Sequence, residues 1–270
     1  MLLKTGDAVS TSREQFDRQA AKYNERWASW SDETLRRMLE LADPQASWRV
    51  LDVATGTGFT ALAFAPLVHS VVGTDISTGM LAEAQKRARE AGVGNVTWRE
   101  AAAQALPFPD ASFDLVTVRI APHHFTDVPA FLRETRRVLG PGGGALVLGD
   151  TTVPDDPEAA AWQNAVERER DPSHVANLSP EQWRALCEAA GFTVTDLDGG
   201  SGRIPIELTA WLETAGCDAE RAGRVRRRFA EAPASARRQF QIVTEGSGGV
   251  RFAWKRVVLR ATAAGAGKAR

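Results

Sequence analysis

One stretch, VLDVATGTGFTALAFA at Val50–Ala65, limits the possible folds of this chain more than any other. Its apolar start predicts a buried strand, and its end has the spacing of a helix. Between them stand two glycines, Gly56 and Gly58, which allow the backbone to approach a bound group closely. This order fits the loose dinucleotide-binding pattern GxGxxA, but two glycines also occur in many ordinary tight turns. The rest of the chain has to decide what the turn holds.

Strand-like and helix-like segments alternate from this stretch to Asp150. The predicted strands are Arg49–Ala54, Ser70–Asp75, Asn95–Glu100, Phe113–Arg119 and Ala145–Asp150. Ser77 is expected to cap the helix after the second strand, and Gly92 to end it. Alternation at this spacing predicts a mainly parallel sheet with helices on both faces. Such sheets bind ligands beyond the carboxyl ends of their strands, where Asp52 and Asp75 fall.

The flanking segments are more helical. Ser179 is expected to cap a helix over Glu181–Gly191, and the segments FTVTDLD and VRFAWKRVVLRA are predicted strands, the second one antiparallel. Residues 204–243 are expected to hold two or three helices. We expect a single domain over residues 1–270, in which the helical segment 12–42 covers the site and the insertion 204–243 caps the substrate pocket.

Composition narrows the range of partners. The 270 residues carry a formal net charge of -1 and 43% hydrophobic residues, which suit an ample core and give no general attraction to nucleic acid or anionic membrane. The two cysteines, Cys187 and Cys217, form no cluster with histidine, so we expect neither a disulfide framework nor a metal site. No apolar run has the length of a membrane span or a secretory signal. We expect a cytoplasmic monomer or homodimer acting on a small molecule.

Two aspartates at strand ends bear on the ligand of the glycine turn. Asp52 ends the first predicted strand just before the turn, where a carboxylate would repel a pyrophosphate but would suit a cationic ligand. Asp75 ends the second strand, where a carboxylate can accept hydrogen bonds from both hydroxyls of a ribose. The segment LPFPDASFDLV follows the third strand.

Together these motifs resemble the class I S-adenosylmethionine-dependent methyltransferases, in particular the small-molecule branch that includes the ubiquinone and menaquinone C-methyltransferases. VLDVATGTG is similar to the first motif of that family, VVGTDIS to the second, LPFPDASFDLV to the fourth, and RRVLGPGG to the turn before the fifth strand. The resemblance implies a Rossmann-like α/β sheet of seven strands, mostly parallel with the last antiparallel, under a helical cover. It also implies S-adenosyl-L-methionine as cofactor and S-adenosyl-L-homocysteine as product.

The resemblance assigns roles to matching residues. Ala54, Gly56 and Gly58 would line the methionine end of the cofactor, and Asp52 would lie near its ammonium group, through water. Asp75 would hold the ribose hydroxyls. The other contacts implied at matching positions are Tyr23, which resembles an aromatic residue that closes over the cofactor carboxylate, Ile76 against the adenine, Met80, Ala102, Ala103, Gln104 and Arg119. Ordinary helix packing is the alternative role of Tyr23.

Two positions depart from the family pattern. The first motif usually has a glycine where this chain has Ala54, and a methyl group there is commonly tolerated. Family members often carry an acid that accepts the adenine amino group, in the pattern GDAxxLPF, where this chain has Ala102. Adenine recognition then has to come from backbone groups near Ala103 or from Gln104. The second departure leaves open a weaker cofactor affinity or an altered activity.

Methyl transfer from a sulfonium needs a base only when the acceptor atom carries a proton at neutral pH, as in a phenol, an alcohol or a carbon acid. The best candidates are His123 and His124 in the loop after the fourth strand, because histidine titrates near neutral pH. Adjacent histidines usually point different ways, so we expect at most one to face the substrate and favour His124. Asp150 and His174 are further candidates for substrate binding or proton transfer. A structural hydrogen bond is the plain alternative at each position.

Three functions stay open at this point. A small-molecule methyltransferase leads, with O- or C-methylation slightly favoured because the histidine loop offers a base. An NAD(P)-dependent oxidoreductase could use the same turn, but Asp52 and LPFPDASFD argue against it. A cofactor-binding protein with a regulatory or non-methyltransferase role is the third, because Ala102 replaces an acid. The tryptophans are expected to pack in the core, with an apolar roof over the substrate as the alternative. The arginine-rich stretch 221–229 is expected to form a solvated helix face, with binding of an acidic or phosphorylated substrate as the alternative.

Overall fold

The computed structural model describes residues 12–17, 32–140, 143–246 and 248–263. The strands are β1 (Arg49–Val53), β2 (Ser70–Asp75), β3 (Val96–Glu100), β4 (Leu115–Arg119), β5 (Ala145–Thr152), β6 (Phe192–Glu207), β7 (Val243–Thr244) and β8 (Val250–Ala263). The helices are α2 (Asp32–Ala42), α3 (Phe59–Phe64), η1 (Ala65–Leu67), α4 (Thr78–Glu90), η2 (Pro122–His124), α5 (Val128–Leu139), α6 (Pro157–Arg170), α7 (Pro180–Ala189), α8 (Leu208–Thr214), α9 (Ala219–Ala230) and α10 (Ala234–Gln239). Residues 12–17 are also helical.

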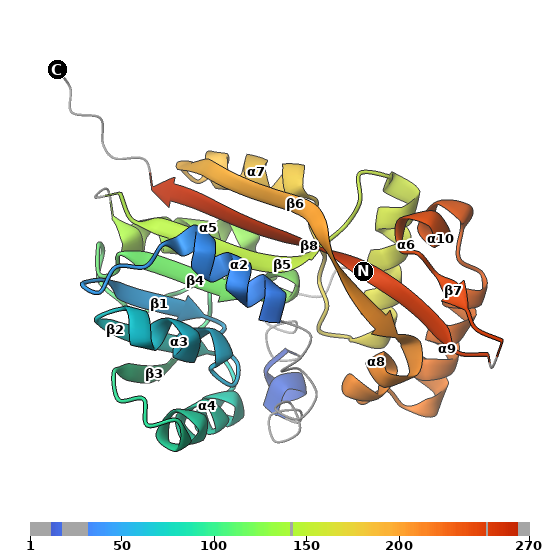
Figure 1. The fold of residues 1–270 in the computed structure, drawn as a ribbon, viewed down its shortest axis with the longest axis horizontal. Coiled ribbons are helices and arrows are strands. Elements are labelled where there is room, and N and C mark those ends of the chain that lie inside the picture. The colour runs from blue at the N-terminus through green and yellow to red at the C-terminus, as the bar shows by residue number, and fades with distance from the viewer. Residues whose placement is uncertain (1–11, 18–31, 141–142, 247, 264–270) are drawn as a thin grey trace.

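The strands form one sheet in the order β3-β2-β1-β4-β5-β8-β6, with β7 paired to β8 off this path (Figure 1). β1 to β5 run parallel, whereas β8 is antiparallel to both of its neighbours, β5 and β6. The predicted sheet of mostly parallel strands, with the last strand antiparallel, is therefore confirmed. Strands β2 and β3 are added on one side of β1, whereas β4 and β5 are added on its other side, so the strand order reverses between β1 and β4. Sheets of the α/β class bind their ligands beyond the strand ends at such a switch point.

The helix boundaries follow from local capping signals. The Ser77 side chain accepts a hydrogen bond from Met80 N at 3.0 Å and caps α4, as predicted. Gly92, with φ 66°, follows the end of the same helix. Ser179 and Gln182 form a capping box at the start of α7. These signals fix where the helices start and thereby set the loops that carry the site.

Helices cover both faces of the sheet (Figure 1). On one face, α5 and α7 contribute Phe131, Leu132 and Trp183 to a buried cluster with residues of β1, β4, β5 and β8. On the other face, α2 and α3 contribute Met38 and Phe64 to a second cluster with residues of the same strands. Successive residues of a strand point to opposite faces, so each strand supplies both clusters. Two dry faces hold the strands, and their carboxyl ends, in fixed positions.

The C-terminal third departs from the expected boundaries. β6 continues to Glu207, so the helices of the insertion begin at Leu208 and not at residue 204. The reason is that Ile204 and Ile206 alternate along the strand and bury on one side of it, opposite β8. They join a third cluster with α6, α8, α9 and α10, which gather at one end of the sheet (Figure 1). Its tryptophans, Trp162, Trp211 and Trp254, pack in the core as predicted.

The expected N-terminal cover is described only in part. The helix 12–17 lies between the two ends of the molecule: Arg13 pairs with Glu100 at 2.6 Å, and Gln15 Nε2 donates to the Ala215 carbonyl at 3.4 Å. α2 packs against the sheet through Met38. Residues 18–31, which include Tyr23, lie outside the described residues. Among the helices that the structure does describe, none has the length and apolar character needed to cross a membrane.

Candidate active site

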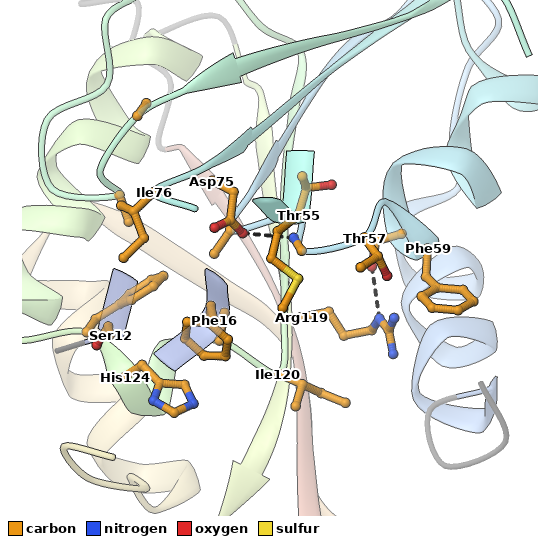
Figure 2. A pocket seen from close by; sticks show the side chains of 18 of the residues that line it. Ser12, Phe16, Thr55, Thr57, Phe59, Asp75, Ile76, Arg119, Ile120 and His124 are labelled. Carbon is orange, nitrogen blue, oxygen red and sulfur yellow. Dashed lines mark hydrogen bonds between the residues drawn. The ribbon is translucent and has the colours of Figure 1, made fainter. Parts of the chain in front are cut away.

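A cavity opens beyond the carboxyl ends of β1, β2 and β4 (Figure 2). It encloses about 1030 Å³, part of which is open to solvent. Its lining comes from the glycine turn after β1, the start of α4, the loop after β3, the loop after β4 and the helix 12–17. We call it the main cavity. Because these segments are far apart in the chain, the cavity exists only through the sheet that aligns the strand ends.

The glycine turn bends through three left-handed residues, Ala54, Gly56 and Gly58, with φ 52°, 54° and 86°. A Cβ added at Gly56 would meet no atom within 4 Å, and Gly56 lines the cavity. A Cβ at Gly58 would lie 2.8 Å from the Trp98 ring and 3.1 Å from Ala84. Ala54 and Gly56 thus face the cavity, whereas Gly58, which is not among the lining residues, is a glycine for packing reasons.

Asp75 reaches the cavity from the end of β2, where its side chain points toward the glycine turn (Figure 2). One carboxylate oxygen accepts a hydrogen bond from Gly56 N and the other from Ser77 N, both at 2.9 Å. Burial raises the pKa of Asp75 to about 6, although these two hydrogen bonds oppose the shift. The carboxylate is fixed in place, and each oxygen keeps a second lone pair for a ligand.

Asp52 lies close to the glycine turn but does not line the cavity. It is 1% exposed, and its two oxygens accept hydrogen bonds from Thr55 Oγ1 at 2.5 Å and Thr117 Oγ1 at 2.7 Å. Burial raises its pKa to about 6, while the two threonines and the charge of Arg119 oppose the shift. Asp52 can therefore act on a ligand through its charge or through an intervening group, which agrees with the expected indirect contact.

Arg119 brings a cation to the cavity at the end of β4. Its Nε donates to Thr60 Oγ1 at 2.9 Å, which orients the guanidinium along one side of the cavity (Figure 2). Thr57 also lines the cavity, and its hydroxyl oxygen is buried without a hydrogen-bond partner among the described residues. Sequence reasoning did not single out Thr57, because nothing in its neighbours marks a threonine whose hydroxyl lacks a partner. A buried hydroxyl of this kind is a site for a ligand group.

Of the adenine contacts predicted in the loop after β3, two line the cavity and one does not. Ala103 and Gln104 line the cavity, and so does Ala101, whose N–H donates to the Asp75 carbonyl at 3.0 Å. Ala102 does not line it and instead forms an isolated bridge with Ala105. Ile76 and Met80, also predicted, are lining residues.

The two adjacent histidines lie in different surroundings, as predicted. His124 lines the main cavity, where its ring packs at a right angle to the Phe16 ring, with the two ring centres 5.0 Å apart (Figure 2). His123 does not line it. Its Nδ1 lies 2.7 Å from Asp150 Oδ1, and its backbone N–H donates to Asp150 Oδ2 at 2.9 Å. Asp150 accordingly holds His123 and lines neither cavity.

The pKa values of the two histidines are shifted in opposite directions. Burial alone would lower the pKa of His123, but the charge of Asp150 and its hydrogen bond raise it above the ordinary value. Burial and the neighbouring His123 lower the pKa of His124 to about 4. The two rings are 4.2 Å apart, so a charge on one opposes a charge on the other. At neutral pH the His124 ring is therefore uncharged, with one ring nitrogen able to accept a proton.

A second cavity of about 460 Å³ lies on the other side of His123. Ile120 lines both cavities and holds a left-handed conformation with φ 52°, which is a strained geometry for a β-branched residue. The remaining lining is mostly apolar, with one buried ion pair at 3.5 Å: Thr151, Glu167, Arg170, Ile204, Ile206, Trp211 and Trp254. The cavity is thus closed by β6 and α8, at the start of the predicted insertion 204–243.

The loop from Asp171 to Asn177 packs behind the histidines. Ser173 Oγ lies 3.0 Å from His124 Nδ1, and His174 Nε2 lies 3.0 Å from Asn164 Oδ1. Burial lowers the pKa of His174, which lines neither cavity, and its contacts match the structural role considered above. No group of three or more His, Cys, Asp or Glu side chains could hold a metal ion within the part of the chain that is described.

Comparison with known protein families gives one domain match. A family described as "Methyltransferase domain" matches residues 50–143, from the start of β1 to the turn before β5. This range holds every lining residue of the main cavity except those of the helix 12–17.

Curated relatives extend the likeness over most of the chain. The uncharacterized methyltransferase YcgJ of Bacillus subtilis is 36% identical over 238 residues, which cover 88% of this chain and 93% of YcgJ. A demethylmenaquinone methyltransferase of Thermus thermophilus is 44% identical over 182 residues, which cover 59% of this chain and 80% of that protein.

Solved structures agree with the sequence relatives. The crystal structure of YcgJ has a TM-score of 0.79 at 35% identity and covers 85% of this chain and 97% of its own. A candidate methyltransferase from Bacillus halodurans has a TM-score of 0.81 at 30% identity, covering 85% of this chain and 98% of its own. The likeness therefore extends well beyond residues 50–143 and includes most of the chain.

Proposed function

Since this chain belongs to the class I S-adenosylmethionine-dependent methyltransferases, we propose that it methylates a small-molecule acceptor bound next to the cofactor in the main cavity. When bound, S-adenosylmethionine supplies an electrophilic methyl group on a sulfonium. The observation that carries the proposal is the pairing of two groups across one cavity. A fixed carboxylate, Asp75, lies on one side, and an uncharged histidine, His124, lies on the other.

The residues of the main cavity fit this cofactor. Gly56 leaves open space where a side chain would project, and the buried Thr57 hydroxyl has no partner among the described residues. Asp75 offers two oriented carboxylate oxygens to the ribose hydroxyls. Ala54 and Gly56 would bind the methionine end, with Asp52 attracting its ammonium group from below the turn.

Adenine recognition would rest on shape and backbone groups. Ile76 and Met80 would pack on the ring. Ala103 and Gln104 line the cavity directly after Ala102, the position at which family members often carry an acid, and would contact the adenine there. Ala102 does not line the cavity and would contribute no side-chain contact. Arg119, held by Thr60, would face the carboxylate end of the cofactor.

For the acceptor we favour an atom that carries a proton, as in O- or C-methylation. Bound S-adenosylmethionine would supply the methyl group to such an acceptor, and the residues of this chain would hold the acceptor and take up its proton. The acceptor proton passes to His124, which is neutral at pH 7 because burial and His123 lower its pKa.

The body of the acceptor would extend past Ile120 into the second cavity. Ile120 separates the two cavities, so a molecule that passes this residue can place its reacting atom in the main cavity. Under this proposal β6 and α8, with Ile204, Ile206 and Trp211, form the cap of the acceptor site. An apolar lining around one ion pair favours a compact molecule with few polar groups.

The test is a calorimetric titration with S-adenosylmethionine and with S-adenosylhomocysteine. Asp75→Ala should weaken both affinities by about 10- to 100-fold, because hydrogen bonds to a charged group are lost. The control is Asp156→Ala, which removes another aspartate that accepts a backbone hydrogen bond, at the start of α6 and away from both cavities. It should lower stability by about 1 kcal/mol and leave both affinities unchanged.

Two results would contradict the proposal. One is equal binding by the wild type and Asp75→Ala. The other is thermal protection by NAD(P) but not by S-adenosylhomocysteine, which would point to the oxidoreductase alternative.

A further inference from the structure

We propose that Asp171 and Ser173 hold His124 in its Nδ1–H tautomer and so present an unprotonated Nε2 to the main cavity. Its role as a base rests on the proposed function, but the tautomer itself does not. Neither Asp171 nor Ser173 lines the cavity, so both would act as positioning residues through the histidine ring.

The hydrogen-bond geometry permits only one arrangement of protons. Ser173 Oγ lies 2.6 Å from Asp171 Oδ1 and 3.0 Å from His124 Nδ1. An ionised carboxylate can only accept, so the single hydroxyl proton of Ser173 points to Asp171. The hydroxyl oxygen is then an acceptor toward His124, and the proton between them belongs to Nδ1. A neutral imidazole carries one proton, which leaves Nε2 with its lone pair.

Asp171 is ionised in this chain of contacts. Burial raises the pKa of Asp171, and the charge of Arg170 and the two hydrogen bonds from Ser173, which do not need a charge on His124, lower it. The Ser173 backbone N–H donates to the same carboxylate oxygen at 2.9 Å. Asp171 is 7% exposed and Ser173 is 4% exposed, so water has little access to these hydrogen bonds.

The backbone fixes the loop that carries these residues. His174 N donates to the Asp171 carbonyl at 3.0 Å, and Val175 N donates to the His123 carbonyl at 2.8 Å. The second contact joins the loop directly to the histidine segment. Ser173 is therefore placed against His124 by the fold, and the contact does not depend on a mobile side chain alone.

His123 has a parallel arrangement on the other side. Its Nδ1 contacts Asp150 directly, at 2.7 Å, so its Nδ1 also carries a proton. The two histidines thus direct their Nε2 atoms to different surroundings, since His124 lines the main cavity and His123 the second. Asp150 acts without an intermediate and favours a charged His123, whereas Asp171 acts through a neutral hydroxyl and leaves His124 uncharged.

The experiment is nitrogen-15 spectroscopy of the histidine side chains in the full chain at pH 7.5, without cofactor. Long-range proton–nitrogen correlations distinguish a protonated ring nitrogen from an unprotonated one, and His124→Gln assigns the signals. The wild type should show a protonated Nδ1 and an unprotonated Nε2 for His124. The reverse pattern in the wild type would overturn the proposal, whatever the variants do.

Ser173→Ala tests the positioning role. It should remove the fixed Nδ1–H pattern of His124, while the signals of His69, an exposed histidine before β2, stay unchanged as an internal control. The affinity of the Ser173→Ala variant for S-adenosylhomocysteine should stay within about twofold of the wild type, because Ser173 does not line the cavity. A His124 pattern unchanged by Ser173→Ala would overturn the role of Ser173. If the wild type does not bind S-adenosylhomocysteine, that result counts against the proposed function and not against the tautomer.

Discussion

On the glycine side of the main cavity, formed by Ala54, Gly56, Thr57 and Asp75, the functional groups come from two neighbouring strands and the turn after one of them. The contact between Gly56 and Asp75 joins residues 19 apart in the sequence. On the histidine side, formed by His123, His124, Asp150, Asp171 and Ser173, the contact between His124 and Ser173 joins residues 49 apart. The glycine side is therefore built locally, and the histidine side is built by the tertiary fold.

This difference separates two kinds of chemistry in one cavity. Backbone conformation and strand ends form the glycine side, which suits a ligand that every member of a family shares. Buried side chains from separate loops form the histidine side, so a change in one loop can alter this side without altering the glycine side. The two sides should therefore respond differently to substitution, and the predictions below are designed to test that.

The largest effect is expected within the glycine side itself. Gly58→Ala places a methyl group 2.8 Å from the Trp98 ring at a residue with φ 86°, so it should lower the free energy of unfolding by about 2 to 4 kcal/mol. Gly56→Ala meets no atom within 4 Å and should cost only about 1 to 2 kcal/mol, from backbone strain. Urea denaturation of both variants measures these changes.

Affinity should show the opposite order. A methyl group at Gly56 enters the main cavity, so Gly56→Ala should weaken S-adenosylhomocysteine binding by at least about tenfold. Folded Gly58→Ala should bind more tightly than Gly56→Ala. If Gly58→Ala is instead stable and defective in binding, the division of the turn into a ligand glycine and a packing glycine is wrong.

The next effect concerns pH. Burial raises the pKa of Asp75 to about 6, so its carboxylate is ionised at pH 7 and mostly protonated at pH 5. If the ribose contacts need the ionised form, the dissociation constant of S-adenosylhomocysteine should rise about tenfold between these values. Calorimetry across this range measures the slope, and Asp75→Asn should flatten it. A full slope in Asp75→Asn would assign the effect to Asp52, whose pKa is also about 6.

The stability of the fold also depends on pH, and Asp75 and His124 contribute to this dependence with opposite signs. Because the folded pKa of Asp75 lies above its unfolded value, protonation of Asp75 as the pH falls through 6 favours the folded state. His124 has the opposite sign, since its folded pKa of about 4 lies below the ordinary value, and stability is lost as the pH falls from about 6.5 toward 4. Circular dichroism at each pH distinguishes loss of binding from loss of fold.

The smallest effect is expected at Ala54, where the family usually has glycine. Its φ of 52° is unfavourable for a residue with a side chain, by about 1 to 2 kcal/mol. Ala54→Gly relieves this strain but adds about 0.4 to 1 kcal/mol of unfolded-state freedom, so the net gain in stability should be about 0.5 kcal/mol. Urea denaturation detects this gain, and a loss of stability would show that the Ala54 methyl group packs favourably.

Sequence patterns predicted the glycine side closely. The apolar run that forms β1, the cap at Ser77 and the acid at the end of β2 are all local signals, and each of them marks a position in the structure. The depth of Asp52 was not predictable, because it depends on Thr117, from the neighbouring strand β4. Gly58 was grouped with Gly56 for a related reason: only the fold brings Trp98 against it.

The histidine side was predictable only as a set of separate candidates. The position of His123 and His124 after β4 indicated a place near the strand ends, and the preference for His124 agrees with the lining of the main cavity, which includes His124 and not His123. Ser173 carried no signal, because a serine in a loop is one of the commonest patterns in proteins and its contact spans 49 residues. The start of the insertion was also misplaced, because Ile204 and Ile206 fit a strand only once β8 is known to lie beside them.

A crystal structure of the complex with S-adenosylhomocysteine tests the division of the cavity most directly. The ribose hydroxyls should lie within hydrogen-bond distance of the Asp75 carboxylate, with the adenine beside Ile76 and the sulfur on the side of the cavity that His124 lines. A ligand whose ribose does not contact Asp75, or whose sulfur lies on the side away from His124, would contradict the assignment of the two sides.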